Sequence, residues 1–251
     1  CGVSVPKMSG KGLGHTGGTI DKLESIPGCR TDASFSDFID YVRNTGFSIV
    51  SQSGNLVPAD KKLYALRDAT ATVDSIPLIA SSIMSKKLAM GADCILLDVK
   101  TGSGAFMKTT EDAQALARLM VATGKNAGKK CMAVITDMDI PLGKAVGNSL
   151  EVIEVTEILK NNVRGRLYEL CIELSADMLM MAGKGTKEEC IRLSEDAISS
   201  GRALDVFRRS IAQQGGDIRF TEDYSVLGEA KKKHVVYSLR DGYISGMDSE
   251  E

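Results

Sequence analysis

Two short and almost entirely apolar runs, each followed by a polar loop and a helical pattern, limit the possible folds most strongly. Cys94–Val99 and Cys131–Ile135 have the composition of strands that are buried on both faces of a parallel sheet. Gly102–Gly104 follow the first run and lead to apolar residues at helical spacing from Thr110, and Asn148 predicts a capping box that opens a helix after the second. This alternation predicts an α/β fold with a mostly parallel sheet.

The overall composition excludes several classes of protein. The 251 residues include 31 basic and 33 acidic side chains, and the net charge of −2 gives no reason to expect nucleic acid or a membrane surface as a partner. Six cysteines occur without a CxxC pair, which favours reduced thiols and a cytoplasmic location. No apolar segment is long enough to span a bilayer. Because the sequence begins at Cys1 without methionine or a signal peptide, we expect it to be a piece of a longer protein.

The composition and the predicted secondary structure change along the chain, which predicts domain boundaries. Asp60–Gly91 is rich in helix-forming residues and is interrupted at Pro77, which predicts two helices. After a lysine-rich segment, the alternation in Val235–Leu239 indicates the first strands of a further domain. We therefore expect a large α/β domain together with part of a small all-helical domain. The predicted boundaries are 1–58 and 92–230 for the α/β domain, 59–91 for the helical segment, and 231–251 for the start of an incomplete C-terminal domain.

The strongest indication of a binding site is a glycine-rich segment near the N-terminus. Five of the nine residues in Gly10–Gly18 are glycine, which lets backbone N–H groups approach an anion, and Lys7 and nearby hydroxyls could add charge and hydrogen bonds. A phosphate fits these demands. The spacing also resembles a dinucleotide-binding turn, but only Val3–Val5 are available as the preceding strand because Pro6 interrupts it. A glycine-rich connection that binds no ligand remains the structural alternative.

A second signal lies in the predicted helices. Ser82 and Lys86 share one helix face with Ile79 and Ile83, and a cation within an apolar stripe is costly unless it is paired or meets a ligand. Together with Arg67, these residues offer donors for carbonyl oxygens and apolar flanks for a flat ring. A lysine that extends its ammonium group to solvent is the alternative explanation.

At these residues the sequence resembles the thymidine and pyrimidine-nucleoside phosphorylase family, most closely its members from Gram-positive bacteria. The run SGKGLGHTGGTIDKLESIPG resembles the family signature, with Lys11 where arginine is usual. The resemblance extends to about residue 230. It is carried by Ser9–Gly28, Gln52–Asp68, Ser75–Lys87, Asp98–Lys108 and Asp137–Val152.

The resemblance implies reversible phosphorolysis of a pyrimidine nucleoside by a homodimer, with inorganic phosphate as co-substrate and no organic cofactor. In the family, closure of two domains brings the two substrates together. The implied phosphate contacts are Lys7, Ser9 and Thr19. The implied catalytic and base contacts are Arg67, Ser82 and Lys86, with Ile79, Ile83 and Phe106 also against the base. The implied potassium ligands are Leu142, Ala145 and Glu154.

The resemblance also implies that part of the active site lies outside this sequence. The family's Lys-His-Ser segment, which contacts phosphate, precedes the region that corresponds to Cys1. We therefore expect the 251 residues alone to have little or no activity. Two alternatives remain: a transferase similar to anthranilate phosphoribosyltransferase, which would depend on phosphoribosyl pyrophosphate, and a nucleoside-binding protein without catalysis.

Overall fold

The computed structural model describes residues 1–12, 17–51, 57–70, 72 and 75–247. Its strands are β1 (Val5–Ser9), β2 (Phe47–Ser51), β3 (Cys94–Thr101) and β4 (Lys130–Asp137). Its α-helices are α1 (Thr19–Glu24), α2 (Phe35–Thr45), α3 (Pro58–Ala69), α4 (Ile76–Ala89), α5 (Thr110–Asn126), α6 (Asn148–Leu159), α7 (Arg166–Met181), α8 (Lys187–Ser199) and α9 (Arg202–Gln213). Two 3₁₀ turns follow, η1 (Ile218–Thr221) and η2 (Tyr224–Leu227).

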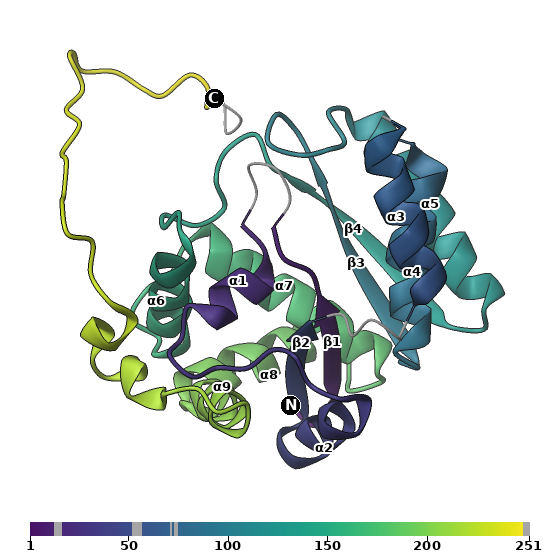
Figure 1. The fold of residues 1–251 in the computed structure, drawn as a ribbon, viewed down its shortest axis with the longest axis horizontal. Helices are drawn as coiled ribbons and strands as arrows, with labels where there is room; N and C mark the ends of the chain where they lie inside the picture. The colour runs from purple at the N-terminus through teal and green to yellow at the C-terminus, as the bar shows by residue number, and fades with distance from the viewer. Residues whose placement is uncertain (13–16, 52–56, 71, 73–74, 248–251) are drawn as a thin grey trace.

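The strands form two parallel pairs, which confirms the predicted α/β class. β1 pairs with β2 in a register that sets Val5 opposite Phe47, and β3 pairs with β4 in a register that sets Cys94 opposite Lys130. β1 and β3 run toward the same side of the molecule, so the loops that follow them lie on that side (Figure 1). Polar loops at the carboxyl ends of parallel strands are the usual position of a ligand site in such folds.

The larger core lies between β3, β4 and the helices that cover them. Ile95, Leu97 and Val99 alternate as the buried residues of β3, and Ala80 and Met84 of α4 pack into the same cluster. Leu116 and Met120 of α5 also belong to it. Pro77 lies in the first turn of α4, where its missing N–H costs no helical hydrogen bond. The two helices predicted for Asp60–Gly91 are therefore present, and α4 is anchored on the α/β core.

A second apolar cluster fixes the glycine-rich loop. Leu23 of α1 packs with Ile26, Val152 of α6, Ile211 of α9 and the fully buried Phe220. This packing holds α1, a helix of only six residues that would not be stable alone. The start of α1 is therefore positioned by tertiary contacts from distant parts of the chain.

Three local predictions are wrong. β1 continues through Pro6 and Lys7 to Ser9, because a strand that pairs through one edge tolerates proline where its N–H is not needed. The first turn of α6 is capped by Gly147 rather than by Asn148, so the predicted capping box is absent. Val235–Leu239 form no strand: in the described part of the C-terminal segment, residues 229–247 extend away from the body without regular structure (Figure 1).

Among the described residues, no helix is long and apolar enough to cross a membrane.

Candidate active site

The glycine-rich loop connects the end of β1 to the start of α1, and one carboxylate holds its two ends together. Ser9 is the last residue of β1 and Thr19 is the first residue of α1. Asp21 Oδ2 accepts hydrogen bonds from the backbone N–H groups of Gly12, at 2.7 Å, and Gly18, at 3.0 Å. A Cβ at Gly18 would lie 2.3 Å from the Gly12 nitrogen. Only glycine fits here, because the loop folds back on itself.

This arrangement corrects one expectation about the loop. The glycine content predicts that backbone N–H groups of this loop converge on an anion. The N–H groups of Gly12 and Gly18 instead donate to the Asp21 carboxylate. These hydrogen bonds lower the pKa of the Asp21 carboxyl, and the bond from Gly12 has the larger effect. Lys11 pairs with Glu24 at 2.8 Å. The N–H groups of Gly12 and Gly18 are therefore not available to an anion. Residues 13–16 of this loop, which include Gly14 and His15, lie outside the described residues.

Lys7 supplies a positive charge on β1, two residues before Ser9. Its side chain reaches solvent, yet desolvation by the surrounding protein lowers its pKa. Lys7 has no hydrogen-bond or ion-pair partner among the described residues. The half-buried Ser9 lies on the same side of β1, two residues further along the strand. The predicted phosphate contacts on β1 therefore share one face.

The predicted base contacts on α4 form a tight polar cluster with α3. Lys86 Nζ lies 2.5 Å from Asp60 Oδ2, 2.8 Å from Ser82 Oγ and 2.9 Å from the Ser82 carbonyl oxygen. Asp60 and Ser82 are buried. An ammonium group has three protons to donate, and these contacts can use all of them. In this state of the chain, a base oxygen could bind Lys86 only by displacing one of its present acceptors.

Arg67 lies on the same face of α3 as Asp60. The two residues are seven apart, which is two helical turns, and Arg67 is 7% exposed. Ile79 and Ile83 of α4 are partly buried and pack against the β3–α5 core. The structure therefore brings Ser82 and Lys86 into contact and places Arg67 on the face of α3 that carries their partner.

The loop after β3 carries the predicted aromatic contact. Phe106 is 59% exposed at the end of a short turn. The backbone of that turn is fixed by Asp139, whose Oδ1 accepts the Ser103 N–H at 2.8 Å. Gly102 has φ +125° and lies against Asp139, where a Cβ would come within 2.6 Å of Oδ1. Close packing against Asp139 therefore explains why residue 102 is glycine.

The predicted metal ligands are brought together in part. Glu154 of α6 accepts the N–H of Lys144 at 2.7 Å and the N–H of Ala145 at 3.1 Å. The carboxylate thus lies against the loop that contains Leu142 and Ala145. Across the described residues, no group of three or more His, Cys, Asp or Glu side chains gathers. A cation at this loop would take most of its ligands from backbone carbonyl oxygens, the donors expected for a hard monovalent ion.

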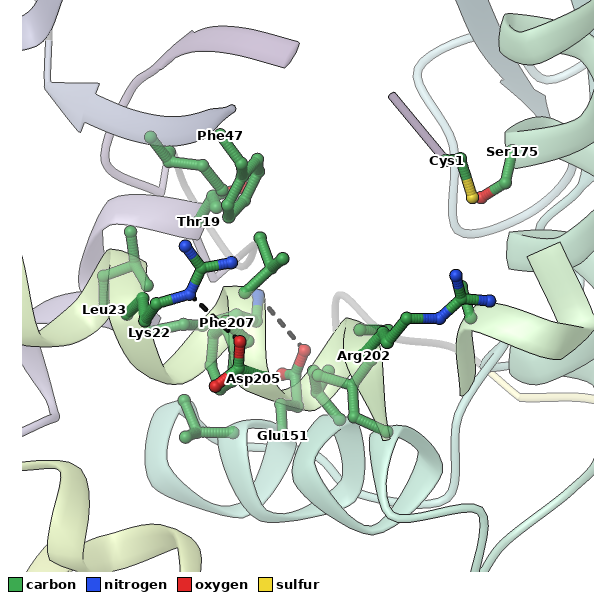
Figure 2. A pocket seen from close by; sticks show the side chains of 18 residues that line it. Cys1, Thr19, Lys22, Leu23, Phe47, Glu151, Ser175, Arg202, Asp205 and Phe207 are labelled. Carbon is green, nitrogen blue, oxygen red and sulfur yellow. Dashed lines mark hydrogen bonds and ion pairs between the residues drawn. The ribbon is translucent and has the colours of Figure 1, made fainter. Parts of the chain in front are cut away.

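A separate cavity of about 730 Å³ lies among α1, α6 and α9 (Figure 2). Of the predicted site residues, only Thr19 lines it. Lys22 and Glu151 form an ion pair in it at 3.1 Å, and Asp205 pairs with Arg209 at 3.0 Å. The remaining lining is mostly apolar, including Phe47 and Phe207. This cavity is not the space between the glycine-rich loop and α4 that the sequence predicts for the substrates.

Sequence reasoning missed three carboxylates that position the site. Asp21 fixes the glycine-rich loop, Asp60 holds Lys86, and Asp139 fixes the turn before Phe106. A signal existed for Asp60, since its spacing of seven residues from Arg67 places both on one helix face. Asp139 is distant in sequence from the turn that it binds, so only the tertiary structure could reveal its role.

Taken together, the fold and the site define an α/β protein with a glycine-rich loop at the end of one parallel strand and a buried cationic cluster on an adjacent helix pair. Residues 1–204 match the family described as "Glycosyl transferase family, a/b domain". The chain therefore belongs to this glycosyl transferase family.

Three relatives show how far the similarity extends. The chain is 54% identical over 245 residues to the pyrimidine-nucleoside phosphorylase of Geobacillus stearothermophilus, with 97% of this chain and 57% of the relative covered. It is 52% identical over 251 residues to that of Staphylococcus epidermidis, covering 100% and 58% respectively. The Staphylococcus aureus (strain USA300) protein is 52% identical over 250 residues, covering 99% and 58%. The chain thus spans somewhat over half the length of these relatives.

Proposed function

We propose that this chain is part of a pyrimidine-nucleoside phosphorylase, which cleaves thymidine, uridine or deoxyuridine reversibly with inorganic phosphate to give the free base and a pentose 1-phosphate. The observation that carries the proposal is the 54% identity to a pyrimidine-nucleoside phosphorylase over nearly the whole chain. Most of the residues that resemble the family's substrate contacts lie on β1–α1 and α3–α4, and Met90 at the end of α4 packs against Met8 of β1.

The proposed chemistry requires an anion on one side of the sugar and hydrogen-bond donors on the other. A phosphate oxygen forms a bond to C1′ while the bond from C1′ to the base nitrogen breaks, and its electron pair leaves with the base. Lys7, Ser9 and Thr19 would hold the phosphate. Donors that meet negative charge as it develops on the base lower the barrier. Arg67 and Lys86 would supply them.

In this proposal the cluster of Asp60, Ser82 and Lys86 orients the Lys86 ammonium group for the base. Asp60 and Ser82 hold the Lys86 ammonium group in one orientation before substrate arrives. Base binding would exchange one of these contacts for a carbonyl oxygen of the pyrimidine. Ile79, Ile83 and Phe106 would contact the ring faces, and the exposed Phe106 has room to move onto a bound base.

Potassium would bind at the loop beside Glu154. Carbonyl oxygens of Leu142 and Ala145 with the Glu154 carboxylate would hold it, and the ion would stabilise the loop between β4 and α6. We further propose a cytoplasmic homodimer in which the part of the protein that carries α3 and α4 closes on the α/β part. Closure of this kind would exclude water from the two substrates.

Steady-state kinetics on the protein encoded by the full open reading frame test the proposal. We expect phosphate-dependent release of base from thymidine or uridine, and little or none from the 251 residues alone. Release that depends on phosphoribosyl pyrophosphate would favour the phosphoribosyltransferase alternative. Calorimetric binding of thymidine and phosphate without turnover by the full protein would favour a nucleoside-binding protein without catalysis.

A further inference from the structure

Two lysines on different elements keep their charges unpaired. Lys7 lies on β1 and Lys87 lies near the end of α4, and neither has a hydrogen-bond or ion-pair partner within the part of the chain that the structure describes. The neighbouring Lys86 differs, because it pairs with Asp60 and Ser82. The chain therefore neutralises one of the two adjacent lysines of α4 and leaves the other available.

Packing brings the end of α4 to β1. Met90, three residues after Lys87 and thus on the same side of the helix, packs in one apolar cluster with Met8, the residue that follows Lys7. Pro6 and Met90 also line a common cavity of about 520 Å³. The segments that carry the two lysines are consequently adjacent, although they are about 80 residues apart in sequence.

The electrostatics of the two lysines agree with this placement. Desolvation lowers the pKa of Lys87, and the charges of Lys7 and Lys86 lower it further. Desolvation also lowers the pKa of Lys7. On α3, the helix that packs against α4, Asp60 forms an ion pair with Lys86 and not with Lys87. Like charges held close together favour the binding of an anion, because the anion removes the repulsion.

We propose that Lys87 is a second cationic contact for inorganic phosphate, which reaches from α4 to the same phosphate that Lys7 contacts from β1. This inference rests on the proposed function and names a residue that the family resemblance did not assign. Phosphate bound in this way joins β1 to the helix that carries Ser82 and Lys86. Its binding therefore positions the base contacts before the nucleoside reacts.

The test is kinetic and uses the protein from the full open reading frame. Lys87→Met removes the charge and keeps a side chain of similar length. We expect the KM for phosphate to rise roughly 10- to 100-fold, the loss typical of one hydrogen bond between charged groups, with a much smaller change in the KM for nucleoside. Lys87→Arg should recover most of the phosphate affinity. Lys125→Met, on the exposed surface of α5, is the matched control and should behave as the unmodified protein.

Two results would overturn the inference: an unchanged KM for phosphate in Lys87→Met, or an equal rise in both KM values that Lys87→Arg does not reverse. If the unmodified protein shows no phosphorolysis at all, the proposed function fails first. Calorimetry with inorganic phosphate then tests the role of Lys87 separately. If Lys87→Met weakens phosphate binding and Lys125→Met does not, the anion site is supported. If Lys87→Met leaves phosphate binding unchanged, the anion site is excluded.

Discussion

Lys86 Nζ lies 2.5 Å from Asp60 Oδ2, and this ion pair joins α3 to α4 at the cluster that carries the predicted base contacts. The side chain of Asp60 is 9% exposed and that of Lys86 is 17% exposed. A buried pair contributes little net stability in itself, but removal of one partner leaves a charge without compensation. The pair therefore makes the orientation of Lys86 depend on an acidic residue of another helix.

Asp60→Asn should destabilise the chain because Lys86 would lose its ion pair with the buried Asp60 carboxylate. We expect a loss of about 2 kcal/mol in the free energy of unfolding, below the value for a fully buried pair because Ser82 still accepts from Lys86. Urea unfolding measures the loss. Glu195→Gln, an exposed change on α8, is the control. Equal stability of the two variants would contradict the importance of the pair.

Gly18→Ala should disrupt the glycine-rich loop, whereas Gly10→Ala should not. A Cβ at Gly18 would lie 2.3 Å from the Gly12 nitrogen and 2.4 Å from the Lys11 carbonyl carbon, and these backbone atoms cannot rotate away. A Cβ at Gly10 meets nothing within 4 Å. We expect a loss of about 1–3 kcal/mol for the first variant and a change within about 0.5 kcal/mol for the second. Thermal unfolding of both variants under one condition makes the comparison, and similar losses would contradict the described loop.

The Asp21 carboxylate should make the loop sensitive to acid. Hydrogen bonds from Gly12 and Gly18 lower its pKa below the ordinary value of 3.8, so the ionised form is favoured in the folded state. Its stabilising contribution is complete above the unfolded pKa and is lost as the pH falls through the lower, folded pKa. The difference in unfolding free energy between the unmodified chain and Asp21→Asn should therefore shrink as the pH falls below 3.8. A difference that stays constant over this range would argue against the contact.

The sequence predicted well where one segment determines the outcome. The apolar runs at Cys94–Val99 and Cys131–Ile135 form paired parallel strands, since a short and nearly all-apolar run is a local signal. The expected burial of both faces is wrong for β3, where Ile95, Leu97 and Val99 are buried and the residues between them are only partly buried or exposed. The interruption near Pro77 likewise separates two helices. Prediction failed where tertiary pairing decides. β1 passes through Pro6 because β2 pairs with it, and Val235–Leu239 remain extended because nothing in the described chain pairs with them.

In the candidate site, too, contacts within one helix were predictable and contacts between distant segments were not. Helical spacing was enough to place Ser82 and Lys86 together, and they are in direct contact. Spacing did not reveal that Asp60 completes this cluster from another helix, or that Asp21 accepts hydrogen bonds from the N–H groups of Gly12 and Gly18. Both are contacts to a carboxylate whose partner is set by folding. Acidic residues near cationic motifs are therefore the first candidates for such positioning roles.

Glu154 offers a test of the loop between β4 and α6. Its carboxylate accepts two backbone N–H groups, from Lys144 and Ala145, and Gln can offer only one acceptor oxygen to them. Glu154→Gln should therefore cost about 1–2 kcal/mol in the free energy of unfolding, since one hydrogen bond to a charged group is lost. Urea unfolding beside the control Glu195→Gln measures this cost. If the loop also binds potassium as proposed, replacing lithium by potassium at constant ionic strength should stabilise the unmodified chain more than the variant. Equal stability of Glu154→Gln and the control would show that the two N–H contacts do not hold the loop.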